Sequence, residues 1–375
     1  GQEEFGPYET VANWPQPVAD AADGVKDEGW TWGSVGAVYA ETPDRIWIAQ
    51  RGELPLPKGA KPWTPYGMIN PSPGNATGNG DGLSATCEPT AKRGWERRYH
   101  HSIIIVDRDG KMVDWWKDAD KIFEGKCGRG AHKIKMSPYD PERHVWIIDH
   151  QLHLIHKFTY DGKLVMTLGT NGQRGRDGGK LFDRPTDIAW LPDGTFFISD
   201  GYGGVRVAKF DKDGKFLMDW GQAPKDPNNP GPNEFNTVHA IQNSNDRKLY
   251  VSDRGHRRIQ IFDENGKFLD MFETGTRASP YALLLDTNGY LWDADGGTQR
   301  ILKYDLQGHY LYGWGGPGGG LGQLNGPHSI TTDQDGNLYL AEVFNGRVQK
   351  FRPKKGADPA KIVGQELRYK ASTSN

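Results

Sequence analysis

The chain is built from short apolar runs separated by polar turns. Runs of alternating or β-branched residues occupy positions 103–106, 205–210, 259–262 and 301–304. Short runs of this composition, bounded by Gly, Asn and Asp, are typical of β-strands. No stretch of the chain shows a convincing helical period. The pattern therefore predicts a protein made almost entirely of β-strands joined by tight turns.

The turns recur at a regular interval. An Asp-Gly or Asn-Gly pair begins at positions 109, 161, 213 and 265, which are 52 residues apart, and a Gln-Gly pair follows at 307. Glycine supplies the positive φ that a tight hairpin needs. A second set of turns begins at 193, 288 and 335, each before another strand-like run. Each repeat therefore holds four short strands, and a four-stranded repeat of roughly 40 to 50 residues is typical of a β-propeller blade.

Six such repeats account for most of the chain. Their first strands begin near Val35, Ala131, Pro185, Val238, Pro280 and Pro327. We therefore predict an all-β fold, a six-bladed β-propeller with four-stranded blades around a central channel, and one domain over residues 1–375. The sixth repeat runs short of a fourth strand near Phe351. Either residues 8–14 or residues 361–367 are expected to complete that blade and close the ring.

Residues 52–100 form a long insertion in the first blade, rich in Pro and Gly. A loop of this length inside a compact domain is usually functional or disordered. Because the insertion begins beside Arg51, at one end of the channel, we expect it to cover the channel mouth. Trp63 and Tyr66 favour packing over disorder for part of it.

The composition narrows the classes of partner. The chain has 50 Gly, 13 Trp and 15 Tyr in 375 residues, which suits a turn-rich β protein. A net charge of −2 with interspersed signs gives no basis for binding nucleic acid or an anionic membrane. No apolar run approaches the roughly 18 residues that a membrane span needs. Cys87 and Cys127 form either one disulfide or two free thiols. We expect a monomer, secreted or periplasmic as a mature chain.

Histidine occupies one register of the aligned first strands, in every second blade. His132, His239 and His328 stand there in blades 2, 4 and 6. In a six-bladed ring alternate blades lie about 120° apart, so these side chains should converge on the channel axis. Three neutral imidazoles with an open fourth position describe a catalytic zinc site. A single histidine in this position would more often be a structural residue, but three at matching register favour a metal.

The turn between the second and third strands opens on the same face as the histidine register. It carries Arg51 in blade 1, Tyr202 in blade 3 and Arg254 in blade 4. Arginine can bind a carboxylate through two hydrogen bonds and can stabilise a phenolate. A phenolate near a Lewis-acidic metal can accept a hydroxyl proton. We therefore expect Tyr202, Arg51 and Arg254 to be catalytic, with the two arginines also binding the substrate.

Other polar residues at these turns have a structural interpretation. Asp200 and Asp253 are expected to be acids of the ordinary repeat, and the two arginines could instead pair with carboxylates between blades. The remaining histidines, among them His150, lack the threefold pattern and are interpreted as surface or packing residues.

Over residues 33–351 the chain resembles the NHL-repeat six-bladed propellers and, within them, the peptidyl-α-hydroxyglycine α-amidating lyases. The most specific stretches are 184–188, 199–203, 238–240, 251–254 and 326–328. The family cleaves a C-terminal α-hydroxyglycine into a peptide amide and glyoxylate.

The resemblance also implies roles for individual residues. It implies that the three histidines hold zinc, that Tyr202 is catalytic and that Arg51 and Arg254 lie near the substrate. It further implies a structural calcium ion, bound partly by the backbone carbonyls of Val38 and Ile134.

The chain departs from this family at several positions. Ser329 stands where the family has a calcium-binding Asp, Gly326 replaces a Met, and Lys133 replaces a Gly. Animal members carry disulfides near the Tyr and Arg turns, where this chain has no Cys. Two alternatives therefore stay open: a metal-dependent lyase or hydrolase acting on another hydroxylated or carboxylated small molecule, and a non-enzymatic NHL binding module.

Overall fold

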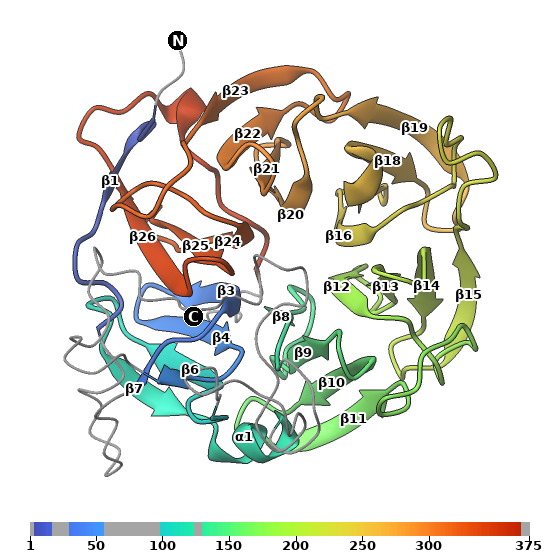
Figure 1. Cartoon of the computed structure of the whole chain (residues 1–375), viewed down its shortest axis with the longest axis horizontal. Helices are drawn as coiled ribbons and strands as arrows, with labels where there is room; N and C mark the ends of the chain where they lie inside the picture. Colours follow the sequence, from blue (N-terminus) through green and yellow to red (C-terminus); the bar gives the residue numbers. More distant parts are fainter. Residues whose placement is uncertain (1–3, 17–29, 56–97, 124–129, 369–375) are drawn as a thin grey trace, which may run out of the picture. The chain divides into compact units, whose positions relative to one another are not determined.

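The computed structural model describes residues 4–16, 30–55, 98–123 and 130–368 (Figure 1). Within these residues, six antiparallel sheets of four strands form the blades of a β-propeller, as the repeats predict. First strands of neighbouring blades contact one another: β12 contacts β16, β16 contacts β20, and β24 contacts β3. The predicted fold class is therefore confirmed.

The first three blades follow chain order from the first strand to the fourth. Blade 1 consists of β3 (Val35–Thr42), β4 (Arg45–Gln50), β6 (Ile103–Val106) and β7 (Met112–Trp115). Blade 2 consists of β8 (Lys133–Met136), β9 (Val145–Asp149), β10 (Leu154–Phe158) and β11 (Leu164–Leu168). Blade 3 consists of β12 (Pro185–Trp190), β13 (Phe196–Asp200), β14 (Arg206–Phe210) and β15 (Phe216–Trp220).

Blades 4 and 5 repeat this order, and blade 6 takes its outer strand from the start of the chain. Blade 4 consists of β16 (Val238–Asn243), β17 (Leu249–Asp253), β18 (Arg258–Phe262) and β19 (Phe268–Glu273). Blade 5 consists of β20 (Pro280–Leu285), β21 (Leu291–Asp295), β22 (Arg300–Tyr304) and β23 (Tyr310–Trp314). Blade 6 consists of β24 (Pro327–Thr332), β25 (Leu338–Glu342), β26 (Arg347–Pro353) and β1 (Tyr8–Thr10).

The pairing of β1 with β26 decides between the two segments that were expected to complete blade 6. Tyr8 stands opposite Pro353 and Thr10 opposite Phe351 in an antiparallel ladder. Tyr8 is buried, and its hydroxyl accepts a hydrogen bond from the amide of Val363 at 2.8 Å. The N-terminal segment therefore supplies the strand, and the tail packs against it.

By contact density the chain divides into two compact units. The first comprises residues 1–134, 299–301 and 312–365, and it holds most of blades 1 and 6. The second comprises residues 135–298, 302–311 and 366–375, and it holds most of blades 2 to 5. A single domain over residues 1–375 stays a prediction.

Blades 2 and 3 illustrate how the repeats pack within the second unit. Side chains of β9, β10, β12, β13 and β14 form one buried cluster that includes Trp146, Ile148, Phe196 and Ile198. Burial of such side chains contributes roughly 25 cal/mol per Å² of apolar surface, which makes it the main stabilising term for short strands. The period-2 alternation of the strands is what directs these side chains into the space between blades.

A buried ion pair recurs at the end of the second strand. Asp200 pairs with Arg206 at 2.9 Å, and Asp253 pairs with Arg258 at 2.9 Å. In blade 6 the same positions hold Glu342 and an arginine at 3.0 Å. The structural interpretation of Asp200 and Asp253 agrees with these contacts.

A short helix, α1 (Lys117–Phe123), links blades 1 and 2 and was not predicted. Seven residues are fewer than the window of roughly 11 to 18 over which a helical period can be seen. Two further segments are single 3₁₀ turns, η2 (Arg254–His256) and η3 (Pro359–Lys361). No helix among the described residues is long and apolar enough to cross a membrane.

The structure describes only the base of the 52–100 insertion. There β2 (Trp30–Thr31) pairs with β5 (Leu54–Pro55). The carboxylate of Glu53 pairs with Arg98 at 2.6 Å, so both ends of the insertion are joined. Residues 56–97, expected to cover the channel mouth, lie outside the described residues, as do Cys87 and Cys127.

Candidate metal centre and active site

The first strands are irregular at the position of the histidine register. The pairing of β16 with β17 shifts between Val238 and Ile241, and that of β24 with β25 shifts between Pro327 and Ser329. The first strands of blades 1, 3 and 5 shift at the corresponding place. A β-bulge of this kind turns a side chain out of the regular alternation and is common beside active sites. The irregularity therefore frees the register residue to point away from the ladder.

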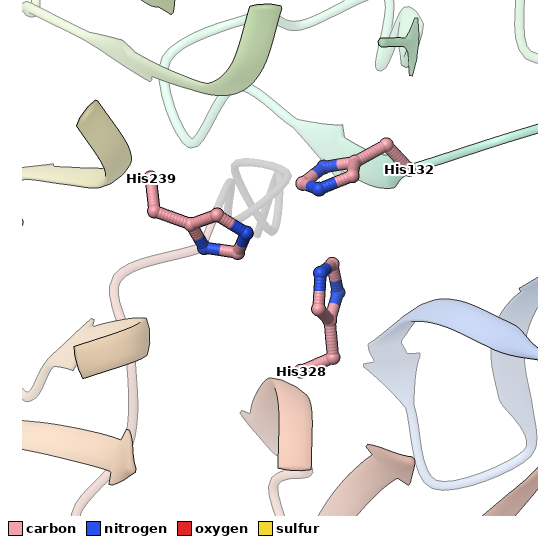
Figure 2. Close-up of side chains that lie close together, drawn as sticks. All are labelled: His132, His239 and His328. Atoms are coloured by element: carbon pink, nitrogen blue, oxygen red, sulfur yellow. The ribbon is translucent and has the colours of Figure 1, made fainter. Parts of the chain in front are cut away.

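The three histidines of the register come together. One ring nitrogen of each of His132, His239 and His328 lies within 4.8 Å of the other two, and all three side chains are buried. Figure 2 shows the three rings turned toward one another. The ring centroids of His132 and His328 are 4.5 Å apart. Three buried imidazoles at this spacing can hold a metal ion.

Backbone carbonyls fix the orientation of two of these rings. Nδ1 of His328 lies 2.8 Å from the carbonyl oxygen of Gly36, and Nδ1 of His239 lies 2.5 Å from that of Tyr281. A proton on Nδ1 donated to a carbonyl leaves Nε2 with the lone pair that a metal needs. The partners hold the same register position in the next blade, Gly36 in blade 1 and Tyr281 in blade 5. The donor set therefore fits a zinc ion bound by neutral imidazoles.

Tyr202 adjoins His239, one of the three histidines of the register. Its hydroxyl oxygen lies 2.9 Å from Nε2 of His239. Nη1 of Arg254 donates to the same hydroxyl at 3.3 Å, and its guanidinium carbon is 4.8 Å from the Tyr202 ring centroid. A second guanidinium, that of Arg184, donates to the backbone carbonyl of Tyr202 at 2.9 Å. Two positive charges beside one phenol stabilise negative charge that develops at its oxygen.

The turn that presents Tyr202 depends on a close backbone approach. A Cβ on Gly201 would lie 1.7 Å from the carbonyl oxygen of Val238, so this position requires glycine. Asp200, directly before the turn, accepts a hydrogen bond from the amide of Asp183 at 2.8 Å. Burial raises the pKa of Asp200 to about 6, although the Arg206 guanidinium opposes that shift. The carboxylate thus acts as a structural anchor of the turn.

Arg51 lies in the first unit, beside His132. Its side chain is buried, and its Nε donates to the carbonyl oxygen of Ala131 at 3.4 Å. Gly36 leaves room for it, because a Cβ there would come within 3.3 Å of the Arg51 Nε. The structure thus places Arg51 next to Ala131, the residue that precedes His132.

The expected calcium site gains no support from its side chains. The hydroxyl of Ser329 donates to the carbonyl oxygen of Val38 at 3.2 Å, where a carboxylate would have faced a cation. Ile134 is buried in β8. Among the described residues, the side-chain cluster that could hold an ion contains the three histidines and no carboxylate. Calcium at Val38 and Ile134 stays a prediction.

Three residues near Tyr202 and Arg254 were missed as site residues. The ring of His150 is buried and lies 5.3 Å from that of Tyr202, and the ring of Tyr281 lies 4.8 Å from the Arg254 guanidinium. His150 shares the turn register of Arg254, and Tyr281 shares the histidine register, so the alignment carried a signal for both. Arg184 stands outside both registers and gave no such signal.

The chain is similar in sequence to curated proteins of two kinds. The chain is 29% identical over 254 residues to peptidyl-alpha-hydroxyglycine alpha-amidating lyase 1 of Drosophila melanogaster, which covers 60% of this chain and 45% of the relative. It is also 29% identical over 280 residues to NHL repeat-containing protein 3 of Mus musculus, with 69% and 74% covered. No protein-family model matches the chain. The chain thus spans less than half the length of the Drosophila lyase.

Among solved structures, virginiamycin B lyase from Staphylococcus aureus superposes with a TM-score of 0.50 and 12% identity, covering 92% of this chain and 99% of that one. At this identity the likeness shows the fold alone. The fold defines the class: a six-bladed β-propeller. In sequence the chain is similar to peptidyl-α-hydroxyglycine α-amidating lyases and to NHL repeat-containing proteins.

Proposed function

We propose that the protein is a zinc-dependent lyase. It cleaves a carbinolamide, such as a C-terminal α-hydroxyglycine, into an amide and glyoxylate, with Tyr202 as the base. The observation that carries the proposal is the 2.9 Å contact between the Tyr202 hydroxyl and Nε2 of His239, the nitrogen that would bind the metal. A metal site alone could be structural, but a tyrosine hydroxyl beside a ligand and an arginine supplies a proton acceptor.

His132, His239 and His328 would hold the zinc ion. When bound, the ion supplies a Lewis acid that polarises a hydroxyl or carboxylate oxygen of the substrate. The carbonyl partners of His239 and His328 keep both rings in the tautomer that can bind it. These contacts preorganise the ligand set before any metal arrives.

Tyr202 moves the proton in this proposal. As the phenolate, its oxygen accepts the proton of the substrate hydroxyl and becomes a neutral phenol. The electrons of that O–H bond form the aldehyde C=O of glyoxylate, and the C–N bond breaks. The proton then passes from the phenol to the departing amide nitrogen, which restores the phenolate, so the reaction balances without water or an oxidant. Arg254, which donates to the Tyr202 oxygen at 3.3 Å, stabilises the phenolate before and after the transfer.

The arginines bind the carboxylate of the substrate. Arg254 lies beside Tyr202 in the second unit, and Arg51 lies beside Ala131 in the first. A guanidinium matches a carboxylate with two parallel hydrogen bonds, which orients the α-carbon as well as binding it. The homology to the Drosophila lyase supports this substrate class.

Two other functions remain as alternatives. The same site could act on another hydroxylated or carboxylated small molecule as a lyase or hydrolase. The second alternative is a non-enzymatic NHL binding module, since the chain is also similar to NHL repeat-containing protein 3 of Mus musculus over 69% of its length.

The proposal is tested by glyoxylate release from N-benzoyl-α-hydroxyglycine. We expect release by zinc-loaded protein, its loss after chelation and its return on adding zinc. His132→Ala should abolish release together with bound metal. His309→Ala is the matched control, because the His309 side chain is 76% exposed and forms a surface ion pair with Asp305 at 2.7 Å. Zinc-loaded protein that releases no glyoxylate would rule out this substrate class.

A further inference from the structure

Tyr281 occupies the histidine register in a blade that contributes no ligand. It follows Pro280 at the start of β20, as His239 follows Val238 at the start of β16. The pairing of β20 with β21 shifts between Pro280 and Ala282, so Tyr281 leaves the ladder in the way the histidines do. The position that holds a metal ligand in one blade therefore presents an aromatic ring in the next.

The ring of Tyr281 contacts Arg254. The Arg254 guanidinium carbon is 4.8 Å from the Tyr281 ring centroid and also 4.8 Å from the Tyr202 ring centroid. Two aromatic faces therefore attract one cation. Such contacts strengthen when the cation is removed from water. The two rings limit the orientations that the guanidinium can adopt.

The surroundings of Tyr281 are built around its ring. A Cβ on Gly296 would lie 2.5 Å from the ring, so glycine at that position makes room for it. The space opposite Gly296 is therefore filled by an aromatic ring whose face is available to the guanidinium.

The backbone of Tyr281 has a separate role. Its carbonyl oxygen accepts the Nδ1 hydrogen bond of His239 at 2.5 Å. A substitution of the side chain leaves this carbonyl in place. Metal binding and arginine positioning can therefore be separated by experiment at one residue.

We propose that the Tyr281 ring is a positioning group, which holds the Arg254 guanidinium edge-on to the carboxylate of the substrate. The carboxylate rests on the proposed function. With two aromatic rings each 4.8 Å from its central carbon, the guanidinium is restricted in orientation, and its remaining N–H groups stay available to a planar anion. Tyr281 thereby determines specificity for ligands that end in a carboxylate, and it acts through Arg254 without touching the reacting atoms.

The test measures binding of hippurate, an N-acylglycine that has the carboxylate but no hydroxyl to react. Calorimetry on the zinc-loaded full chain should show Tyr281→Leu binding hippurate roughly tenfold more weakly than the wild type, the size of a desolvated cation–π contact. Tyr281→Phe should recover most of the affinity because it restores the ring. Bound zinc should be the same in all three proteins.

A double-mutant cycle with Arg254→Ala shows whether Tyr281 acts through the arginine. Tyr281→Leu should add little to the loss of hippurate affinity that Arg254→Ala causes alone. Tyr290→Leu is the matched control: it removes a ring that lies 3.5 Å from the Lys303 ammonium in the same blade, and hippurate affinity should not change.

Several outcomes would overturn the proposal. The proposal fails if the wild-type protein does not bind hippurate, or if Tyr281→Leu binds it with wild-type affinity. It also fails if Tyr281→Leu lowers hippurate affinity equally in the Arg254→Ala background, or if Tyr281→Phe binds hippurate as weakly as Tyr281→Leu. If hippurate binding depends on both residues but no glyoxylate is released from the hydroxylated substrate, the lyase proposal fails and the positioning role stands.

Discussion

Blades 4 and 6 place a histidine at the same register of their first strands but surround it differently. His328 follows Pro327 in β24, and its Nδ1 contacts the carbonyl of Gly36, a residue with no side chain. His239 follows Val238 in β16, and its Nδ1 contacts the carbonyl of Tyr281, whose ring packs on Arg254.

The difference separates what the repeat provides from what the individual blades add. In both cases the register and its bulge present a histidine, and a carbonyl of the following blade orients the ring. Among the described residues, the surroundings of His239 add Tyr202, Arg254 and a second aromatic ring. The candidate metal site therefore comes from the repeat, whereas the proposed base and the arginine beside it come from blades 3 and 4.

The largest expected effect comes from removing either histidine. His328→Ala and His239→Ala should each lose bound zinc and all measurable glyoxylate release, because loss of a ligand exceeds the roughly 10- to 100-fold effect of losing an outer partner. Elemental analysis and the glyoxylate assay measure both. Retention of stoichiometric zinc in either variant would show that the register does not define the ligand set.

Tyr202→Phe should separate chemistry from metal binding. We expect kcat to fall by roughly 10² to 10⁴, the usual contribution of a general base, with zinc content unchanged. Steady-state kinetics on the hydroxylated substrate measures the loss. Tyr310→Phe, on the exposed outer strand of blade 5, serves as the control and should behave as the wild type. A wild-type kcat in Tyr202→Phe would remove Tyr202 from the mechanism.

Gly36→Ala tests whether the Gly36 carbonyl orients His328 of blade 6. A Cβ at Gly36 would lie 2.4 Å from the carbonyl oxygen of Ala131, so the backbone that orients His328 must shift. We expect zinc affinity to fall by roughly 10- to 100-fold, measured by competition with a chelator. In Gly316→Ala the new Cβ would meet only a side-chain atom of Glu4 at 3.6 Å, so affinity should be retained. Equal affinity in both variants would argue against carbonyl orientation.

The smallest effect concerns stability and extends the comparison to the second strands. The third residue of the second strand is Leu340 in blade 6 and Asp293 in blade 5. Asp293 is fully buried, and neither of its carboxylate oxygens has a hydrogen-bond partner among the described residues. Burial raises the pKa of Asp293 well above its ordinary range, and Asp295 adds to the shift. Burial also raises the pKa of the neighbouring Tyr304, with Asp293 as a second cause.

The sign of the pH dependence follows from the raised pKa. Because the folded-state pKa lies above the unfolded value, stability is present in full below the unfolded pKa and is lost as the pH rises through the folded pKa. Asp293→Leu should remove this pH-dependent loss of stability and raise the free energy of unfolding by about 1–3 kcal/mol at high pH. Urea unfolding of both proteins across the pH range measures it. Parallel pH profiles would contradict the assignment.

The sequence predicted the features that repeat. The turn spacing located all six blades, and the shared register located three histidines that the structure brings together. These predictions succeed because each depends on local turn chemistry and on strand period, which one chain displays several times.

Features that occur once were harder to predict. Arg184 reaches both the backbone carbonyl and the ring of Tyr202 across a turn, and α1 is too short to show a period. His150 carried a register signal, but its burial against Tyr202 depends on how blades 2 and 3 pack. Contacts that depend on side-chain direction and on packing between blades leave no pattern along the chain.

The central claim is that three histidines of alternate blades bind one zinc ion. X-ray absorption at the zinc edge of purified, zinc-loaded protein tests it most directly. We expect a shell containing three imidazole nitrogens at about 2.0–2.1 Å, lost in the His132→Ala, His239→Ala and His328→Ala variants. A shell without imidazole, or one that survives these substitutions, would contradict the account.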